Sequence, residues 1–170
     1  MALDATPGGE NANSYVTLAQ ASAYHATHLY ASAWTAASSA TQETAVIMAT
    51  RTLDDWVDWK GNKQDDDQAL RWPRYGVEDR DGYDFEIDEI PVFLINATSE
   101  LARTLIGGDV TAEPDTKGFS KLKVGSLELV VDKEDRDSTT VLPDTVKAMV
   151  EHYGRIRSRN GPTEALLMRS

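Results

Sequence analysis

Two histidines are the first residues of this sequence that could do chemistry. His25 and His28 stand three residues apart, which places both side chains on one face of a helix, where they could share a metal ion. No third ligand follows at a suitable spacing, and His152 is remote in the sequence. We therefore predict ordinary interior or interface histidines rather than metal ligands.

The acidic stretch from Asp79 to Asp88 resembles a calcium-binding loop in composition. An EF-hand loop needs an acidic first ligand, a glycine at its sixth position and a glutamate at its twelfth. With Gly82 as the sixth residue, Val77 would be the first, so the pattern does not fit. We predict a hydrated acidic loop here, and the same for Asp65-Asp66-Asp67.

Motifs for covalent catalysis are missing from the sequence. There is no nucleophile elbow, phosphate-binding glycine loop or dinucleotide-binding motif. There is also no cysteine, which excludes disulfides, thiolate metal sites and thiol catalysis. We predict a protein that is not an enzyme and that needs no cofactor.

An aromatic and proline-containing block has residues that suit a fixed loop better than a reactive site. Pro73 restricts its own backbone and that of Trp72, and Gly76 allows a turn. Large aromatic rings can pack against helices while arginines reach carboxylates. The residues that we predict to anchor the loop are Leu70, Arg71, Trp72, Pro73, Arg74 and Tyr75.

The formal charge of -11 is unevenly distributed along the chain. Most of the acidic excess lies in residues 54–88, whereas basic residues prevail from Lys147 onward. An acidic body repels phosphates at long range, so generic DNA binding is disfavoured. The basic C-terminal section either binds an acidic partner or is a solvated helix end followed by a loose tail.

One mainly α-helical domain is predicted to position these residues. A chain of 170 residues with 41% hydrophobic content can bury one core. No apolar run is long enough to cross a bilayer and no signal-peptide pattern begins the chain, so we expect a soluble, cytoplasmic protein. The prediction is a small bundle of about four helices with one inserted β-hairpin and extended N- and C-terminal arms.

Local signals place the boundaries of these elements. Thr17 and Gln20 fit a capping box at the start of the first helix, and alternating apolar residues around Gly125-Ser126 predict the hairpin. The predicted parts are an N-terminal arm over 1–13, a helical domain over 14–158 and a tail over 159–170. Within the domain we predict helices over 18–30, from 41 to about 60, over 90–107 and from 143 to about 158, an acidic loop over 60–88 and an insertion over 109–140.

Several short motifs follow one another in a particular order. They are Ala12 to Leu18, Ala21, Tyr24, Ala49 to Asp54, Trp59-Lys60-Gly61, Leu70 to Arg74, Ile90-Pro91, Ala97, Glu100-Leu101-Ala102 and Val124-Gly125. In this order they resemble the phage head–tail adaptor family, some of whose members are labelled "putative DnaT-like single-stranded DNA-binding protein". The resemblance runs from Ala12 to about Tyr153 and does not cover the acidic loop or the C-terminal tail.

The resemblance implies a structural virion protein that is assembled in the host cytoplasm and resides at the head–tail junction. Such adaptors form a ring, commonly twelve-fold, that docks under the portal protein, links it to the next neck or tail component (a stopper or tail-completion protein) and lets DNA pass through without sequence-specific binding. An acidic surface would then face the lumen or a neighbouring subunit, and the C-terminal section would contact the portal or a neighbour. The acidic candidates are Asp65, Asp66, Asp67, Asp79, Asp81 and Asp84, and the contact candidates are Arg155, Arg157, Arg159, Leu166, Leu167 and Met168.

Two alternatives to the adaptor remain open. The first takes the single-stranded DNA-binding label at face value, although part of its aromatic set falls on or beside the face predicted for the core, in the most acidic region of the chain. The second is a regulatory or inhibitor protein whose acidity mimics nucleic acid. The candidates for stacking on bases are Trp56, Trp59, Trp72 and Tyr75, and those for binding phosphates are Arg71 and Arg74.

Overall fold

The described part of the chain is mainly α-helical, as predicted. In the computed structural model it comprises residues 2–112, 121–124, 127–130 and 141–158. The segments 113–120 and 131–140, within the predicted insertion over 109–140, and the predicted tail 159–170 lie outside these ranges. The helices of the described residues are α1 (Leu18–Ala26), α2 (Ser32–Ala36), α3 (Ser39–Trp56), α4 (Val92–Gly107) and α5 (Asp144–Val150).

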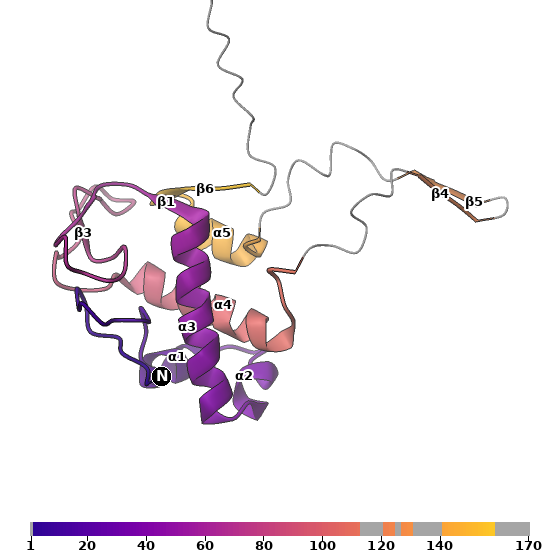
Figure 1. Cartoon of the computed structure of the whole chain (residues 1–170), viewed down its shortest axis with the longest axis horizontal. Helices are drawn as coiled ribbons and strands as arrows, with labels where there is room; N and C mark the ends of the chain where they lie inside the picture. The colour runs from indigo at the N-terminus through magenta and orange to yellow at the C-terminus, as the bar shows by residue number, and fades with distance from the viewer. Residues whose placement is uncertain (1, 113–120, 125–126, 131–140, 159–170) are drawn as a thin grey trace, which may run out of the picture.

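The long helices α3 and α4 pack against each other and carry the core (Figure 1). The Ser38 side chain accepts the Thr41 amide and so caps α3, and Pro91 precedes α4. The remaining helices pack mainly on α4, which is therefore buried along most of one side. No helix of the described ranges is long and apolar enough to cross a membrane. The fully buried aliphatic residues include Val16, Val46, Leu53, Leu94, Leu101, Val146 and Val150.

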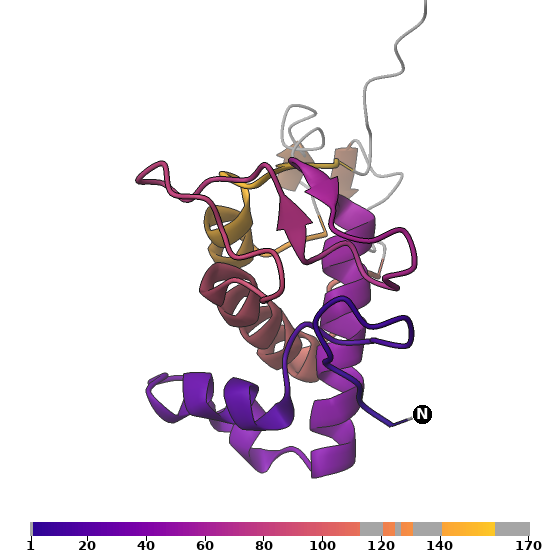
Figure 2. The ribbon, with the colours of Figure 1, turned by 90° about the vertical axis from the view of Figure 1, so that its left-hand side faces the viewer.

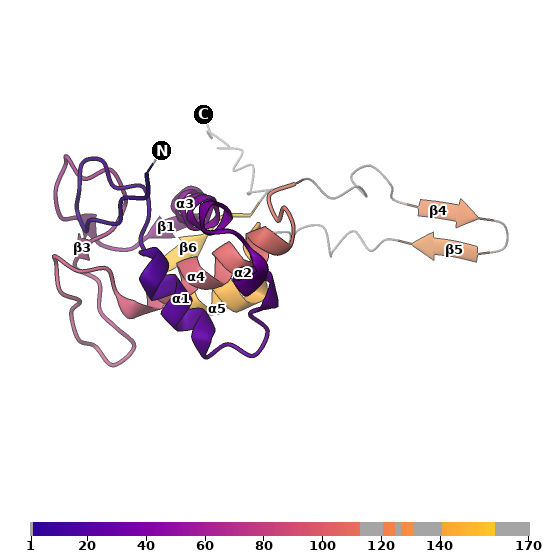
Figure 3. The same ribbon diagram turned by 90° about the horizontal axis from the view of Figure 1, so that it is seen from below.

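Three short antiparallel strand pairs complete the described structure. Strand β1 (Val57–Trp59) pairs with β6 (Gly154–Ile156), so the end of α3 is joined to the C-terminal end of the described chain. Strand β2 (Asn62–Lys63) pairs with β3 (Arg74–Tyr75) across the base of the acidic loop. The predicted hairpin is confirmed as β4 (Lys121–Val124) paired with β5 (Leu127–Val130), which Figure 3 shows apart from the helical body.

The first and last helices differ from the prediction. The predicted capping box is present, but α1 ends at Ala26 and a separate helix α2 forms around the buried Trp34, where we predicted a connection. At the other end, α5 stops at Val150, whereas periodicity predicted a helix to about residue 158. After α5 the chain instead pairs with β1 through β6, and Tyr153 O, just before β6, accepts the amide of Lys60, just after β1.

The N-terminal residues fold back instead of forming the extended arm that we predicted. The carbonyl of Asp4 accepts the amides of Asn13 and Ser14 at 2.8 and 3.1 Å. Gly9 O accepts the amide of Ala69 at 3.1 Å, which ties the N-terminal segment to the acidic loop (Figure 2). The loop is thus held by the N-terminal segment as well as by its own β2–β3 pair.

Two glycines of the acidic loop, one at its start and one near its middle, offer a test of how tightly the loop is packed. Gly61 and Gly76 both have positive φ values, +66° and +71°, so an alanine at either position costs about 1–2 kcal/mol in the left-handed region. A Cβ on Gly61 would also lie 2.3 Å from Tyr75 O, whereas a Cβ on Gly76 would meet no atom within 4 Å. We expect Gly61→Ala to lower the free energy of unfolding in urea by clearly more than Gly76→Ala. Equal losses would contradict the packing described here.

Candidate functional site

A buried carboxylate lies at the centre of the predicted loop anchor. Asp54, in the last turn of α3, accepts a hydrogen bond from the Tyr15 hydroxyl and one from Trp59 Nε1 at 3.3 Å, both on Oδ1. Its other oxygen, Oδ2, accepts the backbone amide of Arg71 at 3.2 Å. One side chain therefore joins the N-terminal segment, β1 and the aromatic block.

The electrostatics of this cluster favour a structural role. Burial raises the pKa of Asp54, although the hydrogen bonds from Tyr15, Arg71 and Trp59 act in the opposite direction. Burial, together with the neighbouring Asp54 charge, raises the pKa of the Tyr15 hydroxyl well above its ordinary value, so Tyr15 stays neutral and donates. The oxygens of Asp54 are occupied by donors from the chain itself, which leaves this carboxylate no free role as a base.

The aromatic block packs into a cluster of rings beside this carboxylate. Trp72 is 1% exposed and meets Trp59 edge-on at a centroid distance of 5.8 Å. It also meets Phe93 at 5.5 Å and Phe85 at 5.9 Å, and the Trp72–Pro73 peptide bond is cis. Of the predicted anchor residues, Trp72 and Pro73 are buried, Leu70, Arg71 and Arg74 are half-buried and Tyr75 is exposed.

Arg74 and Lys63 bind backbone carbonyls, whereas we predicted carboxylate partners for the arginines. Arg74 donates from Nε to Lys60 O and from Nη2 to Gly61 O, both at 2.6 Å, and from Nη1 to Arg71 O at 3.0 Å. Lys63 Nζ donates to Gln68 O at 2.7 Å. These charged hydrogen bonds fix the loop from within.

The acidic candidates are on the surface of the loop. Asp65, Asp66 and Asp67 are exposed, and Asp65 Oδ1 accepts the Asp67 amide at 3.0 Å. Asp79 caps a turn, since its Oδ1 accepts the amides of Asp81 and Tyr83, each at 2.9 Å. In the described ranges no group of three His, Cys, Asp or Glu side chains could hold a metal ion. The remaining candidate, Asp84, is also exposed.

The basic candidates do not form the helix end that we predicted. Arg155 lies on β6, and Arg157 follows it. Arg157 Nε donates to Asp58 Oδ1 at 2.9 Å, so this arginine is paired within its own chain, and both side chains are about half exposed. Arg159, Leu166, Leu167 and Met168 lie outside the described residues.

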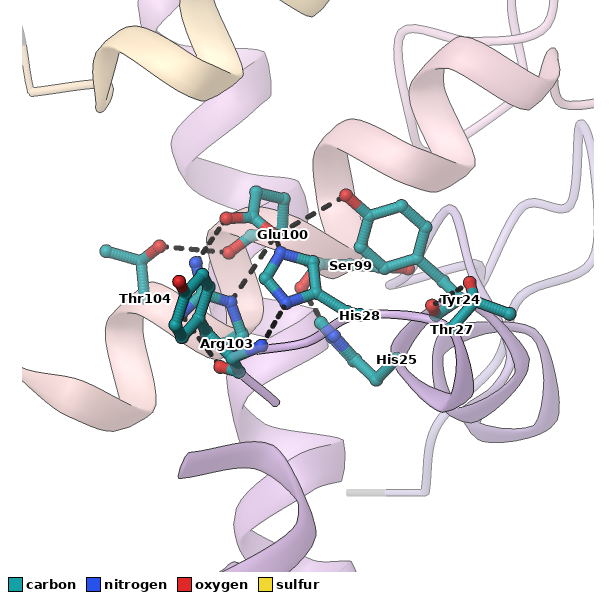
Figure 4. A network of polar contacts seen from close by, with 9 residues as sticks. Tyr24, His25, Thr27, His28, Ser99, Glu100, Arg103 and Thr104 are labelled. Atoms are coloured by element: carbon teal, nitrogen blue, oxygen red, sulfur yellow. Dashed lines mark hydrogen bonds and ion pairs between the residues drawn. The ribbon is translucent and has the colours of Figure 1, made fainter. Parts of the chain in front are cut away.

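A second polar cluster, which the sequence did not reveal, surrounds Glu100 in the middle of α4 (Figure 4). The Glu100 side chain is only 4% exposed and forms an ion pair with Arg103, one turn further along the helix. His28 Nε2 lies 3.5 Å from Glu100 Oε2, and the Tyr24 hydroxyl lies 3.4 Å from the same oxygen. The cluster thus fastens α1 and the 27–31 loop to α4.

The histidines of this cluster are held in defined tautomers. His28 Nδ1 accepts the Tyr30 amide at 3.1 Å, so the proton of the neutral ring lies on Nε2 and faces Glu100. His25 is buried, with Nε2 3.1 Å from Ser99 O, and its Nδ1 has no hydrogen-bond partner. Burial lowers the pKa of His25, in keeping with a neutral ring. Neither ring is arranged with the other as a metal-binding pair.

The described chain is thus a small helical protein with two internal polar clusters, and its sequence matches one known family. The model of a family described as "Putative DnaT-like ssDNA binding protein" matches residues 1–170, the whole chain. The protein therefore belongs to this family. No curated protein and no solved structure matches the chain.

Asp54 offers a direct test of the loop anchor. In Asp54→Asn, an amide group replaces one of the oxygens that accept hydrogen bonds, and its N–H bonds then face a donor. We expect a loss of about 1–3 kcal/mol in the free energy of unfolding, measured by urea denaturation with tryptophan fluorescence. The matched control is Asp55→Asn, the exposed neighbour on the same helix, which we expect to change stability by less than about 0.5 kcal/mol. Equal effects of the two variants would remove the anchor role.

Glu100 gives a prediction for pH dependence. Burial raises the pKa of Glu100, but the hydrogen bond and charge of Arg103, with the two histidines, outweigh it and bring the pKa below its ordinary value. A lowered carboxyl pKa contributes stability above the unfolded-state value of about 4.3, and this contribution is lost as the pH falls through the folded-state value. We expect Glu100→Gln to be less stable than the wild type at pH 7 and the gap to narrow below about pH 4. Glu151→Gln, at an exposed position, is the control, and a gap that stays constant with pH would contradict the assignment.

Proposed function

We propose that this protein is a head–tail adaptor of a phage virion, a structural subunit without enzymatic activity. In this proposal it forms a ring under the portal protein, links the portal to the next neck or tail component and lets DNA pass through. The order of motifs from Ala12 to about Tyr153 supports it, because that order resembles the adaptor family. The structure adds arguments about which residues are available for contacts.

The strongest support is that the aromatic and basic residues of the alternative are used inside the protein. Trp72 and Trp59 are 1% and 8% exposed, whereas stacking on bases needs exposed rings. Arg74 directs its donors to three carbonyls of the loop. Among the six candidates for DNA contact, Tyr75 alone is classed as exposed. The burial of Trp59 and Trp72 and the internal bonds of Arg74 weigh against DNA binding at this place.

Exposed apolar side chains on an acidic protein point to protein partners instead. Leu29 and Tyr30 are 86% and 72% exposed on the loop after α1. Tyr83, Ile87 and Val92 are 72%, 51% and 70% exposed in the acidic loop and at the start of α4. Tyrosine and other large apolar side chains are enriched at the centres of protein interfaces.

The β4–β5 pair also favours assembly. Its register pairs Leu122 with Leu129 and Val124 with Leu127. A two-stranded hairpin is marginally stable in water without a packing partner. A ring of subunits offers such partners, because each subunit meets two neighbours through different surfaces.

The second candidate function is single-stranded DNA binding, which the family description favours. The described residues offer one place for it that the sequence did not indicate. Tyr30 is 72% exposed, and Arg103 Nη1 lies 3.4 Å from its carbonyl oxygen, so a base could stack on the ring beside a cation. Arg103 is already paired with Glu100, which weakens this site.

The first experiment is to measure the mass of the purified protein in solution, alone and mixed with the portal protein of the same genome. The adaptor proposal predicts a complex of fixed stoichiometry with that portal, visible as rings by electron microscopy, and none with the portal of an unrelated phage. The same protein is then titrated with a labelled single-stranded oligonucleotide over a range of salt concentrations.

The oligonucleotide arm separates the two candidate functions. Binding that weakens steeply with salt and is lost in Tyr30→Ala, but kept in the equally exposed Tyr83→Ala, would support the second function. The adaptor proposal would be overturned if the protein formed no complex with the portal protein and bound the oligonucleotide in this way.

A further inference from the structure

A groove lies where the acidic loop meets the start of α4. It has a volume of about 350 Å³, and its floor is aromatic. Phe93 stacks on Tyr153 at a centroid distance of 3.7 Å, and Phe85 lies against both rings at 5.5 and 5.6 Å. The groove thus combines the end of the acidic loop and the first turn of α4, which are continuous, with Tyr153 from the turn before β6, about sixty residues later. Its lining residues are Asp84, Phe85, Glu86, Glu89, Ile90, Pro91, Val92, Phe93 and Tyr153.

The rim of this groove is acidic and unpaired. Asp84, Glu86 and Glu89 are exposed, and within the described ranges no lysine, arginine or histidine forms an ion pair with any of them. Val92 and Ile87 beside them are 70% and 51% exposed, so apolar surface is open to water here. An occupant that offers aliphatic side chains followed by a cation would match both properties.

We propose that the C-terminal segment Ala165-Leu166-Leu167-Met168-Arg169 of the same chain occupies this groove. The segment has consecutive apolar residues, which suit the aromatic floor, and then an arginine, which suits the acidic rim. The proposal is independent of the head–tail role, because it concerns a contact within one chain.

The groove is within reach of this segment. Tyr153 lines the groove, and the described chain continues through β6 to Ser158, only a few residues further on. The eight residues from Ser158 to Leu166 span up to roughly 26–29 Å when extended, against at most about 17–18 Å for the five residues from Tyr153 to Ser158. A short tether also gives an effective concentration in the millimolar range, so the chain's own segment competes well against a second copy at micromolar concentration.

Paramagnetic relaxation enhancement tests the contact in the full-length protein. Because the sequence contains no cysteine, Ser170→Cys provides a single site for a nitroxide label. We expect the label to remove most of the amide signal intensity of Ile87, Val92 and Phe93, and reduction of the label to restore it. The loss is expected to be independent of protein concentration.

Charge variants then identify the groove as the binding surface. The double variant Glu86→Lys, Glu89→Lys changes the rim of the groove and should abolish the loss of signal. The variant Leu167→Asp changes the C-terminal segment and should also abolish the loss, without affecting the folded domain. The matched control is Asp66→Lys with Asp67→Lys, which changes the charge equally at exposed positions that do not line the groove, and it should keep the effect.

Three outcomes would overturn the proposal. The first is full signal intensity at the groove in the labelled wild-type protein. The second is a loss of intensity that persists in the Glu86→Lys, Glu89→Lys variant. The third is a loss seen when isotope-labelled protein without the nitroxide is mixed with labelled Ser170→Cys protein, since that would assign the segment to a second copy.

Discussion

The carboxylate of Asp54 is the constraint on which the loop region of this protein depends. A buried carboxylate is costly unless donors surround it, and here the donors come from Tyr15, Trp59 and Arg71. Each donor belongs to a different segment, so satisfying one charge fixes the N-terminal segment, β1 and the aromatic block together. The ring cluster around Trp72 then covers this junction, and Arg74 ties the loop carbonyls beneath it. Together these contacts keep a long acidic segment ordered.

The parts of the fold that the sequence predicted are those with local signals. The start of α1 has a capping box, α4 has a proline before it and glycines at its end, and the hairpin alternates apolar and polar residues. The parts that were missed depend on distant partners. Helix α5 stops early because β6 pairs with β1, and Glu100 finds His28 and Tyr24 more than seventy positions away in the sequence. Local residue patterns do not indicate such contacts between distant parts of the sequence.

The candidate site shows the same division. The aromatic block was recognised from its residue types, and burial of Trp72 agrees with that interpretation. The partner of Arg74 was predicted wrongly, because a guanidinium can donate to carbonyls as well as to carboxylates, and here three backbone carbonyls accept its donors. The short motifs around Tyr15, Asp54, Trp59 and Arg71, which lie far apart in the sequence, meet at the buried carboxylate. In this structure these residues therefore serve to join separate segments of the fold.

The pairing of β1 with β6 has a consequence for how the protein is made. Val57 opposes Ile156, so the strand that follows α3 obtains its backbone partners only from residues about one hundred positions later. A ribosome adds about 5–20 residues per second, so α3 and the aromatic block emerge several seconds before the segment that completes them. During that interval the edge of β1 and the side chains around it stay uncovered, and the contact that finally closes the chain joins the ends of a long loop. We therefore expect this domain to reach its native state only after β6 has left the exit tunnel. Until then, chaperones can bind the uncovered apolar surface of the nascent chain.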